Sequence, residues 1–336
     1  MSSQDLPIIL YHYIYSPFAK RLVWYLQLRG IPYTQCLQPP IMPRPDLSEK
    51  LGVNYRRIPL LSIGKDIYLD TRLIISKLES LYPSLPKLGA STPDQAAIER
   101  LLESLIVEGV FPSAARLIPT SLPLLKDPKF QKDRMEFTGL KMTAQQAAAL
   151  RPEAVNEIHR AMELLETTLL ADGREWLLKT SQPTLADIEA VWPLHWLVLG
   201  LPGALPKESI NEQKFPKVFA WIKRFDAITR AKAKEVGKVK TVKGDEARDI
   251  ILGSKYSEQG EGLDATSPLV TFHGLKKGSK VAVWPTDTGA SHKDIGELIR
   301  LDEKEVVIQQ PEGSEVRLHA PRHGFRVRPV GEGAKI

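Results

Sequence analysis

Tyr15-Ser16-Pro17-Phe18-Ala19-Lys20-Arg21 is the stretch that decides the fold of this chain. It follows the apolar run Pro7 to Tyr13, which predicts a buried strand. Serine is a preferred residue just before a helix, and proline suits the first helical position because its missing N–H needs no partner there. Arg29 and Gly30 then provide a cationic last turn and a stop signal. We therefore expect a helix from Pro17 to Arg29.

Three further strands are expected after this helix. Ile31 to Leu37 predicts a strand parallel to the first, provided that the helix is a right-handed crossover. Pro59 to Ile63 and Ile67 to Leu69 flank Gly64-Lys65-Asp66, which has the composition of a hairpin turn. Together these segments predict a small βαβ unit followed by a hairpin.

The hairpin is bounded by two informative positions. Pro59 begins a strand, where proline is tolerated only at the first position or at an edge. The Ile58–Pro59 bond is a candidate for the cis form, which would turn the backbone N–H and C=O of Ile58 outward. Asp70-Thr71 ends the hairpin and opens a helix that stops near Tyr82-Pro83.

This order of segments resembles the thioredoxin-like domain of cytosolic glutathione transferases. Ser16-Pro17-Phe18-Ala19-Lys20-Arg21 is most similar to the omega class, whose pattern has cysteine at the position of Ser16. The resemblance implies that Ser16 faces the glutathione sulfur, that the Ile58 backbone beside a cis Pro59 pairs with the cysteinyl unit, and that Asp70 and Thr71 hold the γ-glutamyl end. Thr71 is a mild departure, because serine is usual there.

The resemblance also names a wider set of residues. Basic residues before the cis-proline often meet the glycyl carboxylate, and the candidates here are Arg44, Lys50, Arg56 and Arg57. Phe18 is a further candidate contact to glutathione. Tyr15 is a second candidate catalytic hydroxyl, whereas Tyr11 and Tyr13 are expected to pack.

The residue types fit thiolate chemistry. A thiolate is the nucleophile, so the site must lower the thiol pKa, and a helix N-terminus with one hydroxyl can do so. A drop of one or two units corresponds to about 1.4 to 2.7 kcal/mol. Serine cannot form a mixed disulfide, so we expect conjugation, addition–elimination or isomerisation and no glutaredoxin-like reduction. The alternative is that Ser16 only caps the helix, and both roles are compatible.

Composition bounds the class of protein. The 336 residues suffice for two or three domains, and 43% hydrophobic with 26% charged residues is typical of a globular protein. No apolar run is long enough for a membrane span, and residues 1–5 lack the basic start of a secretory signal. The single cysteine, Cys36, indicates a reducing, cytoplasmic setting and is expected in the core.

The net charge of +6 is concentrated in one segment. Residues 230–244 hold six Lys or Arg against Glu235 alone, so 6 − 1 = +5 falls there. A cationic helix end running into a linker explains this charge, and aromatic residues for base stacking are missing from it. We therefore expect neither a nucleic-acid partner nor a membrane partner.

The middle of the chain predicts helices. Thr92-Pro93-Asp94-Gln95 has the pattern of a capping box, and Thr184-Leu185-Ala186-Asp187 has another. The latter, and the closing segment from Phe215 to Trp221, also resemble the helical domain of glutathione transferases, so the resemblance covers about residues 7 to 235. One expected apolar helix face after Thr92 comprises Ile98, Leu101, Leu102, Leu105 and Ile106, and another comprises Val155, Ile158, Met162, Leu165 and Leu169.

The resemblance places an electrophile pocket between the first domain and the helix near Thr92. Val110 and Phe111 are the candidate apolar lining, with Glu108 as a polar neighbour. The alternative is that these residues belong to the core. Residues 112–150 are longer than the family needs, and we expect a lid or a reshaped pocket there.

The tail departs from the family. From about Leu269, short alternating stretches separated by turns predict four or five strands in a small β-barrel or sheet. Between Thr271 and Ile336 there are 11 Lys or Arg and 9 Asp or Glu, so 11 − 9 = +2, which favours packing on the core or binding a protein partner. The predicted strands are Lys280 to Trp284, Glu305 to Gln309, Val316 to His319 and Phe325 to Arg328.

Two other motifs, a histidine pair and a PxxP pattern, do not predict a binding site of their own. His319 and His323 have a metal-ligand spacing only on a helix, which Pro321 and Gly324 oppose, so no metal site is expected. The segment from Pro39 to Pro45 contains a PxxP pattern, and we interpret it as a loop beside the pocket.

The expected fold class is an α/β thioredoxin-like N-terminal domain plus an all-α domain of glutathione-transferase type, followed by a small, mostly-β C-terminal domain. The expected ranges are 1–86, 90–240 and 265–333. The leading hypothesis is a glutathione transferase with Ser16 as activating residue, glutathione as co-substrate and a small-molecule electrophile, as a possible homodimer. The alternatives are a non-catalytic binding protein of this fold and a glutathione-independent enzyme that uses the interdomain cleft.

Overall fold

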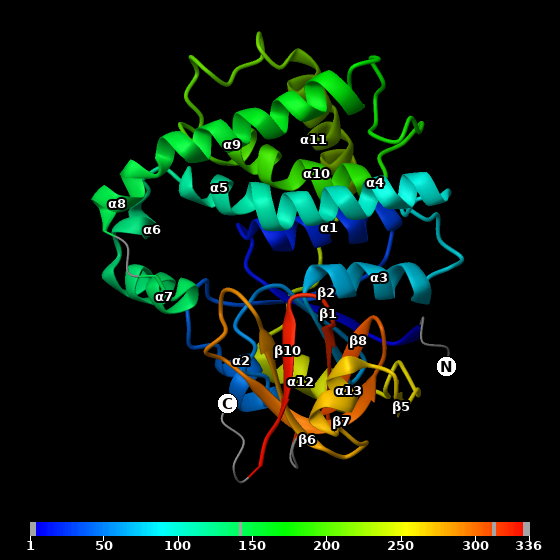
Figure 1. Ribbon diagram of the computed structural model, residues 1–336. Coiled ribbons are helices and arrows are strands. Elements are labelled where there is room, and N and C mark those ends of the chain that lie inside the picture. Colours follow the sequence, from blue (N-terminus) through cyan, green and yellow to red (C-terminus); the bar gives the residue numbers. More distant parts are fainter. Residues whose placement is uncertain (1–4, 141–142, 311–313, 332–336) are drawn as a thin grey trace.

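The computed structural model describes residues 5–140, 143–310 and 314–331. It has the expected three parts (Figure 1): an N-terminal α/β part, a helical middle and a β-rich C-terminal region. The helices α1 and α3 lie between the sheet and the helical part. Among the helices of these described residues, none is both long and apolar enough to cross a membrane.

The N-terminal part has the elements that the sequence predicts. β1 and β2 are parallel, and β1, β3 and β4 pair in antiparallel fashion, as expected for a βαβ unit followed by a hairpin. One boundary differs, because Asp66 opens β4 and is not part of the turn. The elements are β1 (Ile8–His12), α1 (Pro17–Arg29), β2 (Thr34–Leu37), α2 (Pro45–Leu51), β3 (Leu60–Ile63), β4 (Asp66–Leu69) and α3 (Thr71–Leu81).

β1 is buried on both faces and separates two hydrophobic cores. Side chains alternate along a strand. Ile8 and Leu10 therefore face α1, α3 and the helical part, whereas Ile9 and Tyr11 face α2 and the C-terminal region. The continuous apolar sequence of β1 follows from this double burial.

The helical part is built around α10, whose residues are all buried. The capping box at its start is confirmed, because the Asp187 carboxylate accepts a hydrogen bond from the N–H of Thr184 (2.8 Å). The same carboxylate also accepts from the N–H of Leu177 (2.9 Å) and from Nε1 of Trp221 (2.9 Å). The α-helices are α4 (Pro93–Ser104), α5 (Phe111–Arg116), α6 (Pro123–Lys126), α7 (Pro128–Thr138), α8 (Ala144–Ala149), α9 (Arg151–Leu164), α10 (Leu185–His195) and α11 (Pro216–Val236); π-helical turns extend three of them as η2 (Leu105–Val110), η3 (Leu165–Leu169) and η4 (Trp196–Gly200).

Two expectations for α4 are wrong in detail. The Gln95 side chain accepts a hydrogen bond from the N–H of Ser91 (3.3 Å) instead of that of Thr92, so the predicted capping box does not form. Leu101 of α4 and Leu105 at the start of η2 are 69% and 42% exposed, because α4 buries only the narrow face that contacts α10. The second predicted apolar face is confirmed, since Ile158, Met162 and Leu165 are buried and Val155 and Leu169 pack against the core.

The C-terminal region extends the N-terminal sheet and does not form a separate one. β9 pairs with β4 in parallel, so the strand order is β10-β6-β7-β8-β9-β4-β3-β1-β2, with β5 beside β7. A long-range pairing of this kind leaves no local pattern in the sequence. The elements are α12 (Gly244–Leu252), β5 (Gly262–Leu263), α13 (Pro268–His273), β6 (Lys280–Pro285), β7 (Asp294–Leu301), β8 (Glu305–Gln309), β9 (Arg317–Pro321) and β10 (Phe325–Pro329).

Neither the two-residue strand β5 nor the longer strand β7 is predicted from the sequence. Glu297 and Arg300 interrupt the apolar alternation of β7, and its pairing with β8 shifts register between Leu298 and Arg300. Such a bulge breaks the period of two on which strand prediction depends. The other four tail strands lie where they were predicted, within one or two residues.

Candidate functional site

One edge of the sheet brings the predicted glutathione residues together. Tyr11 near the end of β1 pairs with Leu60 at the start of β3, and Leu60 also pairs with Leu69 at the end of β4. The segments that leave or enter the strands at this edge therefore carry Ser16, the Ile58–Pro59 bond and the pair Asp70-Thr71.

Ser16 caps α1. Its backbone is extended (φ −71°, ψ 121°), its Oγ accepts a hydrogen bond from the N–H of Ala19 (3.2 Å), and its own N–H donates to the carbonyl of Tyr13 (3.0 Å). The first turn of α1 contains no acidic residue, so no carboxylate offsets the positive end of the helix dipole. The cap uses one lone pair of the hydroxyl, and the O–H remains able to donate.

The predicted cis bond between Ile58 and Pro59 is confirmed. It lies directly before β3, and Ile58 is 9% exposed. A second cis bond, Met42–Pro43, was not expected and lies in the proline-rich loop before α2.

Asp70 and Thr71 begin α3 as predicted. The Asp70 carboxylate accepts a hydrogen bond from the N–H of Arg72 (2.9 Å), and Asp70 has φ 67° and ψ 134°, a region that is strained for residues with a side chain. The Thr71 hydroxyl accepts a hydrogen bond from Nη1 of Arg21 (2.7 Å). This contact orients the hydroxyl and leaves its O–H free to donate to a ligand carboxylate.

Arg21 lies in the N-terminal motif, and the sequence alone assigns it no role. Its side chain is completely buried, forms an ion pair with Glu189 of α10, and lies 3.3 Å from Glu103 of α4. Burial raises the pKa of the Glu189 carboxyl, and the Arg21 guanidinium opposes that shift. The available signal was an arginine three residues after Phe18 and four before Tyr25, which places it on the same helix face as these aromatic residues.

Arg44 and Lys50, two of the four candidates for the glycyl carboxylate, have other partners. The Arg44 side chain is buried and donates to the carbonyls of Pro39 (3.0 Å) and Arg56. Burial lowers its pKa to about 10. The Lys50 ammonium pairs with Asp245 of α12. The structure therefore engages both cations within the protein.

Arg56 and Arg57 are likewise engaged, by elements that flank the cis-proline. Arg56 forms an ion pair with Asp133 of α7 (2.6 Å), and Arg57 pairs with Asp287 of the β6–β7 loop and donates to the carbonyl of Thr288 (2.9 Å). The N–H of Met42 also donates to Asp133 (2.9 Å). The 112–150 insertion and the tail thus both contact the segments before Pro59.

The three electrophile-pocket candidates do not share one environment. Val110 is buried in the core, and Phe111 packs against Phe18 and Trp192 with ring centroids 4.7 and 4.9 Å apart. Glu108 instead lies on the surface toward α3 and the tail, where it pairs with Arg72 (2.9 Å) and His323 (2.7 Å). Phe18 therefore joins the first domain to the helical part.

The other candidate hydroxyls and the single thiol differ in their exposure to solvent. Tyr15 is 56% exposed, its ring lies 4.9 Å from that of Tyr13, and partial burial raises the pKa of its phenol. Tyr11 is buried, as expected. Cys36 is in the core as predicted, and burial raises the pKa of its thiol to about 11, which opposes a nucleophilic role.

His319 and His323 have separate environments. His323 is on the surface, whereas the buried imidazole of His319 lies between Asp66 (3.0 Å) and Glu305 (3.1 Å). Ligand atoms of Glu258, Glu305 and His319 lie within 4.8 Å of one another, a spacing that could hold a metal ion. However, both imidazole nitrogens contact carboxylates, and Lys77 and Arg300 neutralise the acidic groups, so the cluster fits an ion-pair network better than a metal site.

Comparisons with known proteins agree with this architecture. Residues 10–87 match the N-terminal domain of glutathione S-transferases, and residues 113–234 match a domain of unknown function, DUF7962. The comparison with curated proteins gave no significant match.

Solved structures share the fold at low sequence identity. A GST-like protein from Pseudomonas syringae aligns over 96% of this chain and 99% of its own, with 24% identity and a TM-score of 0.69. A Tau class glutathione S-transferase from mango (Mangifera indica) covers 72% of this chain and 96% of its own (18% identity, TM-score 0.50). A beta-etherase from Sphingobium sp. strain SYK-6 covers 69% and 98% (19% identity, TM-score 0.52). The fold is therefore of the glutathione transferase type, and the alignment with the Pseudomonas protein is long enough to include most of the tail.

Proposed function

We propose that this protein is a glutathione-dependent transferase of the serine type. The observation that carries the proposal is the convergence of Ser16, the cis Ile58–Pro59 backbone and the Asp70–Thr71 pair at one edge of the sheet. The match of residues 10–87 to the N-terminal domain of glutathione S-transferases supports it.

In this proposal the glutathione thiol loses its proton to solvent, and the thiolate lies at the N-terminus of α1. The Ser16 O–H donates to the sulfur, while the helix dipole favours the negative charge. The thiolate then attacks an electrophilic carbon of a small apolar substrate. A carbon–sulfur bond forms and the leaving group departs with its electron pair. In the isomerisation or elimination variant, the carbon–sulfur bond then breaks and its electron pair returns to the sulfur as the thiolate.

The rest of glutathione would be held by polar groups at the same edge. The backbone N–H and C=O of Ile58 would pair with the cysteinyl unit in the manner of a short added strand. The Thr71 hydroxyl, held by Arg21, would donate to the γ-glutamyl carboxylate near the N-terminus of α3. Arg21 would act as a positioning residue, since it reaches the ligand only through Thr71.

Calorimetry with glutathione and turnover of a chloronitroaromatic electrophile test the proposal. We expect Ser16→Ala to lower kcat/KM about tenfold or more, corresponding to at least about 1.4 kcal/mol of transition-state stabilisation. Ser16→Cys is the matched control, which should gain thiol–disulfide exchange because a cysteine can form a mixed disulfide.

Loss of the cap is the competing effect of Ser16→Ala and is expected to cost about 1 kcal/mol of folding stability. Thermal unfolding of the same variants separates the two effects. A variant that loses only this stability and keeps full turnover would show that the hydroxyl is structural.

A second candidate function is a non-catalytic binding protein of this fold. It is favoured by the engagement of Arg44, Lys50, Arg56 and Arg57 with protein groups, which leaves each of them paired within the chain. Absence of heat with glutathione, together with absence of turnover, would decide for this alternative.

A further inference from the structure

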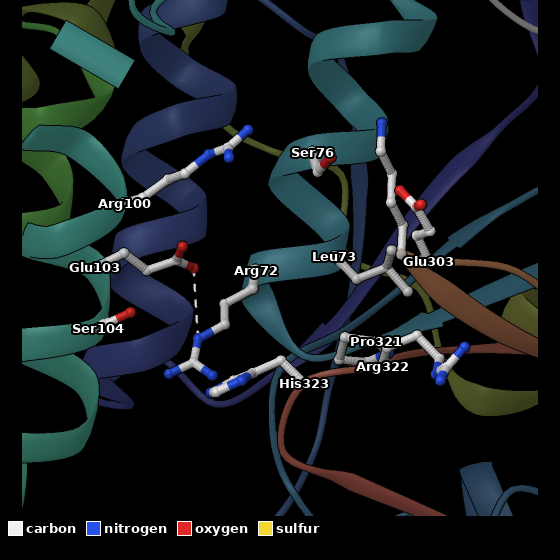
Figure 2. Close-up of a pocket in the computed structure, with 11 residues that line it drawn as sticks. Arg72, Leu73, Ser76, Arg100, Glu103, Ser104, Glu303, Pro321, Arg322 and His323 are labelled. Carbon is white, nitrogen blue, oxygen red and sulfur yellow. Dashed lines mark ion pairs between the residues drawn. The ribbon is translucent and has the colours of Figure 1, made fainter. Parts of the chain in front are cut away.

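A cavity of about 390 Å³ lies where the tail meets α3 and α4. Helices α3 and α4 form one wall, and the turns β7–β8 and β9–β10 form the other (Figure 2). Volumes of about 300–1,000 Å³ are typical of small-molecule sites. The two walls are more than 190 residues apart in sequence, so this groove exists only when the tail is docked on β4.

The groove carries an excess of positive charge. Arg72, Arg100, Lys304 and Arg322 line it, against the carboxylates Glu103 and Glu303, so the lining charge is 4 − 2 = +2 before any protonation of a histidine. Glu108, which pairs with Arg72 at one end, reduces the local excess to 2 − 1 = +1. Glu103 is already shared between two cations, Arg21 (3.3 Å) and Arg72 (3.4 Å). This excess of positive charge in the lining attracts anions to the groove.

Three of the cations form no ion pair within the described residues, although Arg100 interacts electrostatically with Glu99, and Arg322 with Asp264. Arg100 and Lys304 have no ion pair there, and Arg322 donates only to uncharged oxygens, the Asp302 carbonyl (2.5 Å) and the Ser267 hydroxyl (3.3 Å). Buried arginines such as Arg21 and Arg29 pair with a glutamate, whereas Arg100 and Lys304 are solvent-exposed and Arg322 is half-buried. An anionic ligand in this hollow would contact several guanidinium and ammonium groups at once.

Figure 2 shows how the donors are arranged around the groove. Arg100 reaches from α4 toward α3, and the imidazole of His323 lies beside the Arg72 guanidinium. Arg72 and His323 share the carboxylate of Glu108 (2.9 and 2.7 Å), which fixes both at one end. The hydroxyl of Ser76 has no hydrogen-bond partner among the described residues and faces this lining as an uncharged donor.

We propose that this groove binds a small phosphorylated molecule. A phosphate monoester presents a tetrahedral dianion that accepts from several donors at once, which suits guanidinium, ammonium and hydroxyl groups that surround it. The volume exceeds that of a phosphate alone and leaves room for the attached organic group. The lining of the groove does not include Ser16, although Arg72 directly follows Thr71. The test uses phosphate probes and does not depend on glutathione binding.

Titration calorimetry of the full chain at low ionic strength tests the assignment, with glycerol 3-phosphate, inorganic phosphate and succinate as probes. The test variant is Arg100→Gln with Lys304→Gln. The control is Arg116→Gln with Lys207→Gln, two exposed cations elsewhere that change the net charge equally. We expect glycerol 3-phosphate affinity to fall about tenfold, or about 1.4 kcal/mol, in the test variant and less than about twofold in the control.

The relative affinities of the three probes distinguish the kinds of ligand. Tighter binding of glycerol 3-phosphate than of inorganic phosphate supports an ester ligand, and equal binding of the two supports a site for free phosphate. Equal losses in the two double variants, succinate binding as tight as the phosphates, or no heat from either phosphate would overturn the proposal. Circular dichroism and the unfolding midpoint of each variant establish that it is folded.

Discussion

Arg21 of α1 contacts three other helices of this protein. Its guanidinium leaves α1 and contacts Thr71 of α3, Glu103 of α4 and Glu189 of α10. A completely buried charge is tolerated only when it is paired, because its desolvation costs several kcal/mol. The pairing therefore couples the relative positions of the first domain and the helical part to the orientation of the Thr71 hydroxyl.

Replacing Arg21 by methionine should strongly destabilise the fold. The substitution leaves the Glu189 carboxylate buried without its partner, and we expect a loss of about 3–5 kcal/mol in the free energy of unfolding. Urea denaturation measures it. The double variant Arg21→Met with Glu189→Leu should recover most of the loss, and a double variant as unstable as the single one would contradict this account.

Asp70 provides a second prediction at the residue scale, which rests on the proposed function. Asp70→Asn keeps an oxygen that can accept from the N–H of Arg72, so the cap and the unfolding midpoint should change little. The variant removes the negative charge that would meet the γ-glutamyl amino group. Glutathione affinity by calorimetry should therefore fall about tenfold, and unchanged affinity would remove Asp70 from the site.

At the scale of elements, the junction between β4 and β9 holds the tail on the core. Asp66 opens β4, His319 belongs to β9 and Glu305 to β8, and Lys77 of α3 pairs with Glu305 (2.6 Å). Burial alone would lower the pKa of His319, but the hydrogen bonds and charges of Asp66 and Glu305 outweigh it and raise that pKa. Burial raises the pKa of Glu305, but the hydrogen bonds and charges of His319 and Lys77 outweigh burial and lower this pKa to about 2.

The stability of this junction should depend on pH. Because the folded-state pKa of His319 is raised, its contribution is fully present below the unfolded pKa of about 6.5 and is lost as the pH rises through the folded pKa. His319→Gln should therefore destabilise the protein more at pH 6 than at pH 9, as measured by urea denaturation at both values. An equal difference at the two pH values would mean that the buried imidazole is neutral.

A second buried group ties the tail to the segment before the cis-proline. The Asp294 carboxylate at the start of β7 accepts a hydrogen bond from the N–H of Asn54 (2.6 Å), and burial raises its pKa to about 7. Such a contact joins elements 240 residues apart in the chain. It accounts for the close approach of the tail to Arg57.

At the scale of the whole molecule, one continuous sheet carries both the proposed catalytic edge and the tail. The core that faces α2 and α12 contains residues from the first domain, such as Ile67 of β4, and from the tail, such as Leu318 of β9. The register places these two residues opposite each other. Two segments that share a sheet and a core are expected to unfold together.

Native-state hydrogen exchange tests this cooperativity. The amides of β4 and β9 should open with the same free energy under conditions where global unfolding controls exchange. Amides in β9 that exchange about tenfold faster or more, equivalent to about 1.4 kcal/mol, would show that the tail detaches as an independent unit. The exposed helix α8 should exchange faster than either strand, and it serves as the internal reference.

The amino-acid sequence by itself determined the local elements of the first domain, the Ser16 cap, the cis bond at Pro59 and the Asp70–Thr71 helix start. Those features depend on caps, prolines and apolar periodicity within a few residues, which are visible in a single chain. The tertiary structure alone decided the pairing of β9 with β4, the bulged strand β7, the partners of Arg21, Arg44 and Lys50, and the cationic groove between tail and helices. These depend on contacts between residues dozens to hundreds of positions apart, and the free energy of such contacts comes from burial and charge pairing that no local pattern records.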